Sequence, residues 1–354
     1  MSTHRGNKLT ERYRPAGAGV ARLDGRHFPH LSCVAARRQV TAKKPKYTRI
    51  SIPLIALTGA TGFIGRYLLR KLPEQGYRVR VLLRRPIDGQ LDAASAVIGD
   101  LTQPRNMTAA LEGVDAVVHS AGLAHTATGQ PASDYRLLNT DATIALARAA
   151  QRAGVKRFVF LSSIRAQSGA TASEIITEQL PPRPTDVYGQ SKLAAEQGLA
   201  ELAIDWVALR PVLVYGPGVK GNMAKLMQLA RSPYPLPLGG LGARRSLLSL
   251  DNLASAVATV LSAHHQLCQP LIVADADALT VGEMIAAMRR GFGRQANLFA
   301  LPERLLRAAC RAVGQLDSYE RLAGELVVDA SSLRGLGWTP SVRTADGLAN
   351  LMRG

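Results

Sequence analysis

The sequence predicts an α/β fold, in which helices connect the parallel strands of a central sheet. From Ile50 onward, short apolar runs alternate with Ala- and Leu-rich stretches of helical length, a pattern typical of βαβ units. The first apolar run leads directly into the glycine-rich segment TGATGFIG, Thr58 to Gly65, which opens a helical stretch. These observations indicate a doubly wound parallel sheet of the Rossmann type with a smaller C-terminal substrate-binding lobe.

The elements of this fold follow one another in a regular order. Apolar runs that suit strands buried on both faces begin at Ile52, Tyr77, Ser95, Asp115, Arg157 and Trp206. The helices between them are expected in GFIGRYLLRKLPEQG, MTAALEG, NTDATIALARAAQRAG and SKLAAEQGLAELA. After Pro217 this alternation gives way to loops rich in Pro and Gly. We therefore expect a dinucleotide-binding domain over residues 50–217 and a mainly substrate-binding lobe over residues 218–354, whose chain can cross back to the sheet.

The net charge of +18 is concentrated at the N-terminus. Residues 1–49 hold twelve of the 44 Lys and Arg residues and two of the 26 Asp and Glu residues. A nucleic-acid partner is not expected, because no recognition motif accompanies this charge and the rest of the chain is only moderately basic. We expect a disordered extension without catalytic function. A mitochondrial transit peptide and a translation start assigned too far upstream are the alternatives.

Cysteine spacing and hydropathy bear on the compartment. Cys33, Cys268 and Cys310 lie far apart without CxxC spacing, so neither a disulfide framework nor a metal site is expected. The N-terminal segment holds no apolar run long enough for a signal-peptide core or a membrane span, which excludes stable membrane insertion there. The helix expected from Pro302 to Gly314 is interpreted as a core helix, with contact to anionic lipid as the alternative. We expect a cytoplasmic protein, and a homodimer is compatible with these features.

The glycine-rich segment predicts a turn that binds a pyrophosphate. Backbone N–H groups at the start of the following helix point toward such a ligand, and the helix dipole favours its negative charge. Gly59 is expected to make the tight turn, Gly62 to remove a side chain where the phosphate lies, and Gly65 to allow close packing of helix on strand. The other cofactor-binding residues expected in this segment are Thr61, Phe63 and Ile64.

The end of the second predicted strand bears on which dinucleotide binds. In folds that prefer NAD, an Asp or Glu at this point binds the adenosine ribose 2′-hydroxyl, whereas an Arg accommodates a 2′-phosphate. Here the strand ends in Leu83, Arg84 and Arg85. Two guanidiniums can form charge-assisted bonds to a phosphate, so the sequence favours NADP(H), with NAD(H) as the alternative.

A candidate catalytic set follows the fifth predicted strand. Tyr188 and Lys192 lie at i and i+4 and therefore on one face of a helix. A nearby ammonium is expected to lower the pKa of the tyrosine, which could then exchange a proton with a substrate oxygen while a hydride moves. The strand RFVFLSS ends in Ser162 and Ser163, whose hydroxyls could polarise a carbonyl. Lys192 is also expected to hold the nicotinamide ribose.

Taken together, these segments resemble the extended short-chain dehydrogenase/reductase family. TGATGFIG, GDL, HSAG, the serine pair and YGQSK occur in the order of that family, and the match covers roughly residues 52–350. The resemblance implies that Ser163, Tyr188 and Lys192 are catalytic, with Tyr188 and Lys192 also contacting the cofactor. It further implies cofactor contacts from Asp100 and Leu101 of GDL, from Ser120, Ala121 and Gly122 of HSAG, and from Pro211 of the turn that runs to Gly218.

The same resemblance extends to the substrate. The stretch Arg244 to Ala254 is similar to the segment of nucleotide-sugar epimerases and reductases in which an Arg binds the substrate diphosphate, and Arg245 takes that position. Ser162, Ser163 and Asn222 are the other substrate-binding residues that it implies. The segment from Gly324 to Pro340 is similar to the endings of bacterial O-antigen enzymes that act at C4 of UDP-N-acetylhexosamines. The expected partner is therefore a UDP-sugar.

The resemblance leaves alternatives open. Gln167 and Ser168 stand where galactose epimerases often have Val-Tyr, which favours acetamido sugars over glucose and galactose. An epimerase and a 4-keto-reductase share every residue named above, because both exchange a hydride at one carbon. A hydroxysteroid-type dehydrogenase would leave Arg245 without a diphosphate, and a non-catalytic dinucleotide-binding protein would not need the intact Tyr188 and Lys192.

Overall fold

The computed structural model describes most of the chain from residue 52 onward. The described residues are 52–86, 93–103, 105, 107–123, 129–312, 314, 319 and 323–353. The expectation of a disordered extension over residues 1–49 therefore lies outside them. Contacts group residues 50–354 as one unit, in which both the sheet and the smaller C-terminal region lie.

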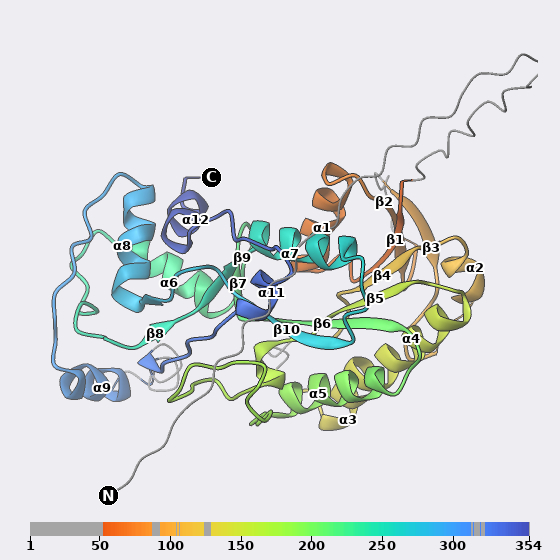
Figure 1. Cartoon of the computed structure of the whole chain (residues 1–354). Helices are drawn as coiled ribbons and strands as arrows, with labels where there is room; N and C mark the ends of the chain where they lie inside the picture. The colour runs from red at the N-terminus through yellow and green to blue at the C-terminus, as the bar shows by residue number, and fades with distance from the viewer. Residues whose placement is uncertain are drawn as a thin grey trace, which may run out of the picture. The chain divides into compact units, whose positions relative to one another are not determined.

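A seven-stranded parallel sheet forms the centre of this unit (Figure 1). Its strand order is β10-β6-β5-β4-β1-β2-β3, so the first strand lies inside the sheet and the chain winds outward in both directions. The strands are β1 (Leu54–Thr58), β2 (Arg78–Leu83), β3 (Ala94–Val97), β4 (Ala116–His119), β5 (Arg157–Leu161), β6 (Asp205–Pro211) and β10 (Gln269–Val273). The predicted α/β fold of the Rossmann type, with its smaller C-terminal region, is confirmed.

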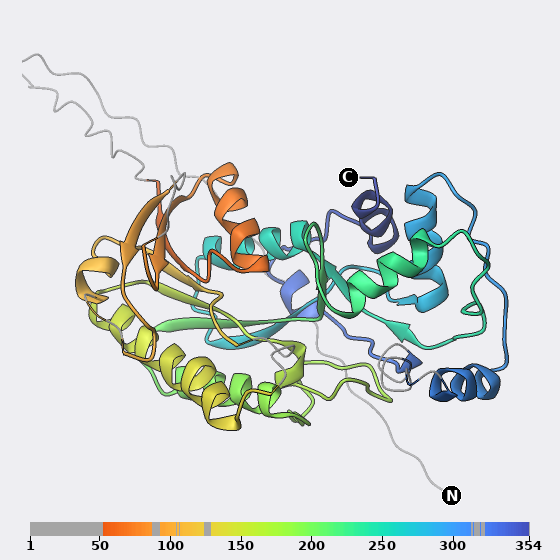
Figure 2. The same ribbon diagram turned by 180° about the vertical axis from the view of Figure 1, so that it is seen from behind.

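Two helical layers cover the sheet (Figures 1 and 2). Along β1, Ile55 and Leu57 belong to one core cluster and Leu54 and Ala56 to another, as the two-residue period of a strand requires. The first cluster packs under α1 (Phe63–Glu74) and α7 (Leu250–Ser262), and the second under α2 (Met107–Leu111), α4 (Ala142–Arg152) and α5 (Val187–Ala200). Both faces are thus buried, which explains the continuous apolar runs of these strands.

The last predicted strand differs from expectation. The run from Trp206 is divided at Val212: β6 ends at Pro211, and β7 (Leu213–Tyr215) leaves the large sheet to pair with β9 (Leu247–Ser249). The edge of the large sheet is instead β10, which pairs with β6 in parallel, with Leu271 opposite Leu209. The chain therefore returns to the sheet after Pro217, through a strand that the apolar runs did not single out.

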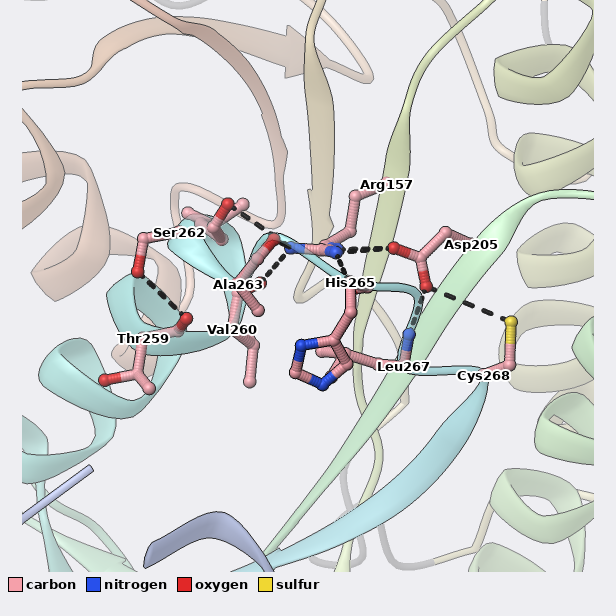
Figure 3. Close-up of polar contacts among 10 residues, drawn as sticks. Arg157, Asp205, Thr259, Val260, Ser262, Ala263, His265, Leu267 and Cys268 are labelled. Carbon is pink, nitrogen blue, oxygen red and sulfur yellow. Dashed lines mark hydrogen bonds and ion pairs between the residues drawn. The ribbon is translucent and has the colours of Figure 1, made fainter. Parts of the chain in front are cut away.

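An arginine on β5 holds this returning segment (Figure 3). The Arg157 guanidinium donates to Asp205 Oδ2 at 2.7 Å, to Val260 O at 2.6 Å, to Ala263 O at 2.8 Å and to His265 O at 2.7 Å. It thereby caps the end of α7 and reaches the loop before β10. Arg157 and Asp205 are the first residues of β5 and β6, so this buried pair lies at the amino edge of the sheet.

The C-terminal region packs around a third apolar cluster, which includes Met223, Leu226, Ile285, Met288 and Leu348. Its helices are α6 (Asn222–Arg231), α8 (Val281–Gly291), α9 (Glu303–Ala312), α11 (Ser331–Arg334) and α12 (Thr344–Leu351), and β8 (Arg244–Arg245) pairs antiparallel with β11 (Leu279–Thr280). The described residues also include the short helical segments α3 (Ala132–Tyr135), the π-helix η1 (Arg136–Asp141) and the 3₁₀ helix η2 (Ile164–Ala166). Among the described residues, no helix is long and apolar enough to cross a membrane.

Candidate active site

The turn between β1 and α1 has the geometry of a phosphate-binding loop. Gly59 adopts a positive φ of 70°, and a Cβ added to Gly65 would lie 2.1 Å from Gly59 O, so only glycine lets the helix approach the strand this closely. Gly62 caps α1 without a side-chain hydrogen bond, and the first turn of the helix has no acidic residue. Phe63 and Ile64 begin the helix and are partly buried, while Thr61 is exposed. These features fit a bound pyrophosphate.

The end of β4 packs against this turn, as expected for the HSAG segment. Ser120 Oγ donates to Thr58 O at 2.7 Å, and Ala121 N donates to Thr58 Oγ1 at 3.3 Å. A Cβ added to Gly122 would lie 3.4 Å from Lys192 Nζ, so this strand end lies between the glycine-rich turn and the predicted catalytic lysine. The structure therefore brings the predicted cofactor residues of β1, β4 and α5 together.

The two arginines after β2 lie close to a carboxylate. Arg84 Nη2 forms an ion pair with Asp100 Oδ2 at 3.0 Å, and Thr102 donates to Asp100 Oδ1 from both its backbone N and its hydroxyl at 2.9 Å. The Thr102 hydrogen bonds, and then the charges of Arg84 and Arg85, lower the pKa of Asp100. Two guanidiniums and one carboxylate thus lie near where the adenosine is expected, with Leu101 next in the chain. The sequence did not predict the Arg84–Asp100 pair.

The predicted catalytic residues meet at the carboxyl edge of the sheet. Ser163 is the second residue after β5, caps η2 by accepting from Arg165 N at 3.2 Å, and hydrogen-bonds with the Tyr188 hydroxyl. Asp186 caps α5 by accepting from Gly189 N at 2.7 Å, which starts the helix that carries Tyr188 and Lys192. Lys192 is buried, and its Nζ donates to Leu161 O at 3.0 Å and lies 4.5 Å from the centre of the Phe160 ring.

Burial has the largest effect on the pKa values of Lys192 and Tyr188. Desolvation lowers the pKa of Lys192 to about 8, and the carboxylate of Glu196 opposes this shift. Desolvation also raises the pKa of Tyr188, against the lowering effects of the Ser163 hydrogen bond and the Arg165 charge. The expectation that Lys192 lowers the pKa of Tyr188 was therefore wrong for the protein alone. The reason is geometric, since the ammonium points to Leu161 O and lies 6.0 Å from the centre of the Tyr188 ring.

Of the two adjacent serines, only Ser163 lies against Tyr188. Ser162 is buried, and its hydroxyl donates to the Glu196 carboxylate in the protein interior. The expectation that Ser162 binds substrate is therefore not supported by its orientation. Successive residues of an extended chain point to opposite sides, so one of the pair had to face inward.

The other two expected substrate residues, Arg245 and Asn222, come from the C-terminal region. Arg245 lies in β8, where its guanidinium donates to Gly324 O and, at 2.9 Å, to Ala170 O. Burial and the nearby charge of Arg165 lower the pKa of Arg245, so two cationic side chains approach each other beside the catalytic set. Asn222 is the first residue of α6 and is partly buried. Pro211, buried at the end of β6, completes the carboxyl edge.

Several residues of this region were missed from sequence. Asn139 is fully buried, accepts from Leu123 N at 2.8 Å and donates to Ser191 Oγ at 3.0 Å, which ties the chain after β4 to α5. Asp186 pairs with the guanidinium of Arg165. Glu196 was also missed, although its position in the sequence could have identified it, because it lies one helical turn after Lys192 and on the same face of the helix.

His119 has a structural environment. It is fully buried between Thr58 Oγ1 at 2.7 Å and Thr143 Oγ1 at 3.0 Å, and burial lowers its pKa to about 3, which leaves it neutral. Within the described part of the chain, no group of three or more His, Cys, Asp or Glu side chains has a geometry that would hold a metal ion.

Comparison with known proteins agrees with this geometry. Residues 55–273 match the model of the NAD dependent epimerase/dehydratase family. The chain is 33% identical over 305 residues to a UDP-glucose 4-epimerase of Vibrio cholerae, covering 83% of this chain and 92% of that protein. The structure of UDP-N-acetylglucosamine 4-epimerase from Bacillus cereus has the same fold, with a TM-score of 0.68, 23% identity, and coverage of 85% of this chain and 100% of that one. MoeE5 in complex with UDP-glucose and NAD is similar with a TM-score of 0.65, 25% identity, and coverage of 84% and 97%.

Proposed function

The chain belongs to the NAD-dependent epimerase/dehydratase family, and on this basis we propose that it exchanges a hydride at C4 of a UDP-acetamido sugar. The reaction is either reduction of a 4-keto sugar or epimerisation at C4. We place it in surface polysaccharide biosynthesis in the cytoplasm, with a homodimer as the expected assembly. The similarity to a UDP-glucose 4-epimerase over most of both chains supports the reaction class.

The observation that carries the proposal is the meeting of Ser163, Tyr188 and Lys192 beside the end of β4. The nicotinamide, when bound, supplies or accepts the hydride. In reduction, Tyr188 donates its phenolic proton to the C4 oxygen of the sugar, while the Ser163 hydroxyl holds that oxygen by a hydrogen bond; in oxidation, Tyr188 takes the proton back. Lys192 holds the nicotinamide ribose through hydrogen bonds from its ammonium group.

Arg245 and Asn222 are proposed to hold the sugar nucleotide. A guanidinium forms charge-assisted hydrogen bonds to phosphate oxygens, and Arg245 is held in place by its bonds to two backbone carbonyls. A hydroxysteroid substrate would carry no group to match this charge.

The cofactor preference remains a proposal of its own. Membership of the family implies an NAD-type dinucleotide, and we propose that Arg84 and Arg85 favour the 2′-phosphate of NADP(H) over NAD(H). This proposal is supported by the net positive charge that remains on Arg84, Arg85 and Asp100 after Asp100 has paired with Arg84. A phosphate-bearing ribose would approach two guanidiniums, of which one is already oriented by that carboxylate.

Two incubations of the pure protein test the function. UDP-N-acetylglucosamine is supplied with NAD⁺ or NADP⁺ in one, and its 4-keto-6-deoxy derivative with NADPH in the other, followed by product analysis. A reductase consumes NADPH absorbance in proportion to the keto sugar, whereas an epimerase forms the C4 epimer with absorbance unchanged. If neither substrate is converted and Arg245→Ala changes nothing, the nucleotide-sugar assignment is wrong, and a hydroxysteroid-type dehydrogenase or a non-catalytic dinucleotide-binding protein replaces it.

A further inference from the structure

A network of buried, hydrogen-bonded polar side chains lies directly behind the catalytic residues. Ser162 donates its hydroxyl to Glu196 Oε1, and Arg210 donates from Nε to the two oxygens of Glu196 at 3.1 and 3.2 Å. A second guanidinium nitrogen of Arg210 forms an ion pair with Glu196, and a third donates to Gln167 Oε1. Glu196 and Arg210 are only 3% and 2% exposed, so both charges are withdrawn from water.

This network links every segment that carries the catalytic groups. Ser162 is the neighbour of Ser163 after β5, Glu196 lies one turn after Lys192 on α5, and Arg210 lies near the end of β6. Gln167 follows η2, and its amide donates to Thr177 O at 3.1 Å and to Leu180 O at 2.7 Å. The network therefore connects the end of β5, the catalytic helix and the loop between η2 and α5.

Stability alone is a poor explanation for such a network. The desolvation of a buried ion pair offsets much of its attraction, and apolar residues of similar size often stabilise a fold at least as well. A buried pair with satisfied hydrogen bonds does, however, hold its partners in one arrangement. Here the partners held are the immediate neighbours of the catalytic hydroxyl and the catalytic ammonium.

We infer that Glu196 is a positioning residue, which holds the Ser163 hydroxyl in place through Ser162 and anchors α5 one turn after Lys192. The inference rests on the proposed function for its activity assay only. Glu196 does not touch the reacting atoms, because its carboxylate is enclosed by Ser162 and Arg210.

Because Glu196 carries a negative charge, its removal should change how activity and cofactor binding depend on pH. Burial lowers the pKa of Lys192 to about 8, and Glu196 is the group that raises it. Without this negative charge, Lys192 loses its proton at a lower pH. The other charged or titratable groups around the lysine, from α5, its cap and the described elements packed against it, are Tyr188, Asp186, Arg165, Tyr135, His119 and Arg210.

The test compares Glu196→Gln and Ser162→Ala with Asp205→Asn. Asp205 is the matched control, because it forms the other buried carboxylate–arginine pair of β6 but lies at the opposite edge of the sheet. Three quantities are measured: kcat/KM against pH, the Kd for NAD⁺ against pH, and the melting temperature.

We expect Glu196→Gln to lower kcat/KM about 10- to 100-fold, as displacement of a catalytic group does, and to move the alkaline limb of both pH profiles to lower pH. Ser162→Ala should lower kcat about tenfold, with KM and the alkaline limb unchanged, because it removes only the link to Ser163. Asp205→Asn should lower the melting temperature without changing either profile.

Two results would overturn the inference. One is a Glu196→Gln variant whose pH profiles superimpose on those of the wild type; the other is a Ser162→Ala variant with the full kcat. If Glu196→Gln does not fold, Ser162→Ala decides alone, since it removes a single hydroxyl. If the wild type converts no UDP-sugar, the proposed function fails, while the pH dependence of NAD⁺ binding still reports whether Glu196 controls the charge of Lys192.

Discussion

Replacement of Tyr188 by Phe separates the chemistry of the site from its architecture. The ring keeps its edge-on contact with Tyr135, at 6.4 Å between ring centres, and only the hydroxyl that bonds with Ser163 is lost. Removal of one such hydrogen bond costs about 1 kcal/mol of folding stability, which lowers the melting temperature of a chain this size by about 1–2 °C. Folding and cofactor binding should therefore persist.

Turnover should fall far more than stability. A general acid–base residue contributes roughly 100- to 10,000-fold, equal to about 3–5.5 kcal/mol of activation free energy. The assay is kcat with a UDP-sugar at several pH values, alongside the Kd for the dinucleotide. Tyr215→Phe is the matched control, because Tyr215 donates a buried hydroxyl to Asp275 at 2.9 Å away from the catalytic set. It should lose stability and keep its kcat. A Tyr188→Phe enzyme with near-wild-type kcat would refute the assignment of Tyr188 as the proton-exchanging group.

Three further predictions concern the charged groups. Arg245→Ala should raise the KM for the UDP-sugar about 10- to 150-fold, the equivalent of a charge-assisted bond of about 1.5–3 kcal/mol. Replacement of the exposed neighbouring residue by Arg244→Ala should leave this KM unchanged. Equal KM values in both variants would contradict the diphosphate role. The double variant Arg84→Ala/Arg85→Ala should lose affinity for NADPH but not for NADH, measured by fluorescence titration, and a wild-type preference for NADH would refute the proposal. Activity should decline as the pH rises through about 8, because burial depresses the pKa of Lys192 to that value and the ammonium is the active form; a constant kcat/KM up to pH 10 would exclude this.

Local patterns were sufficient wherever a function depends on residues close together in the chain. The turn from Thr58 to Gly65 combines a strand end, a helix start and glycines within a few residues, so its role in packing α1 on β1 follows from its sequence. The placement of Tyr188 and Lys192 on one helix face follows from helical periodicity in the same way. Strands β1, β2, β4, β5 and β6 were predictable because burial on both faces leaves continuous apolar runs, whereas the edge strand β3 is mostly exposed.

What the sequence alone determined is therefore the α/β alternation, the glycine-rich turn and the Tyr–Lys pair. Contacts between distant segments required the tertiary structure, because no local pattern encodes them. Only the structure decided that β10 closes the edge of the sheet, that Arg84 pairs with Asp100, and that Ser162 turns inward to Glu196. The protonation of the site belongs to the same class, since the pKa values of Tyr188 and Lys192 depend on how much water the folded chain excludes around them.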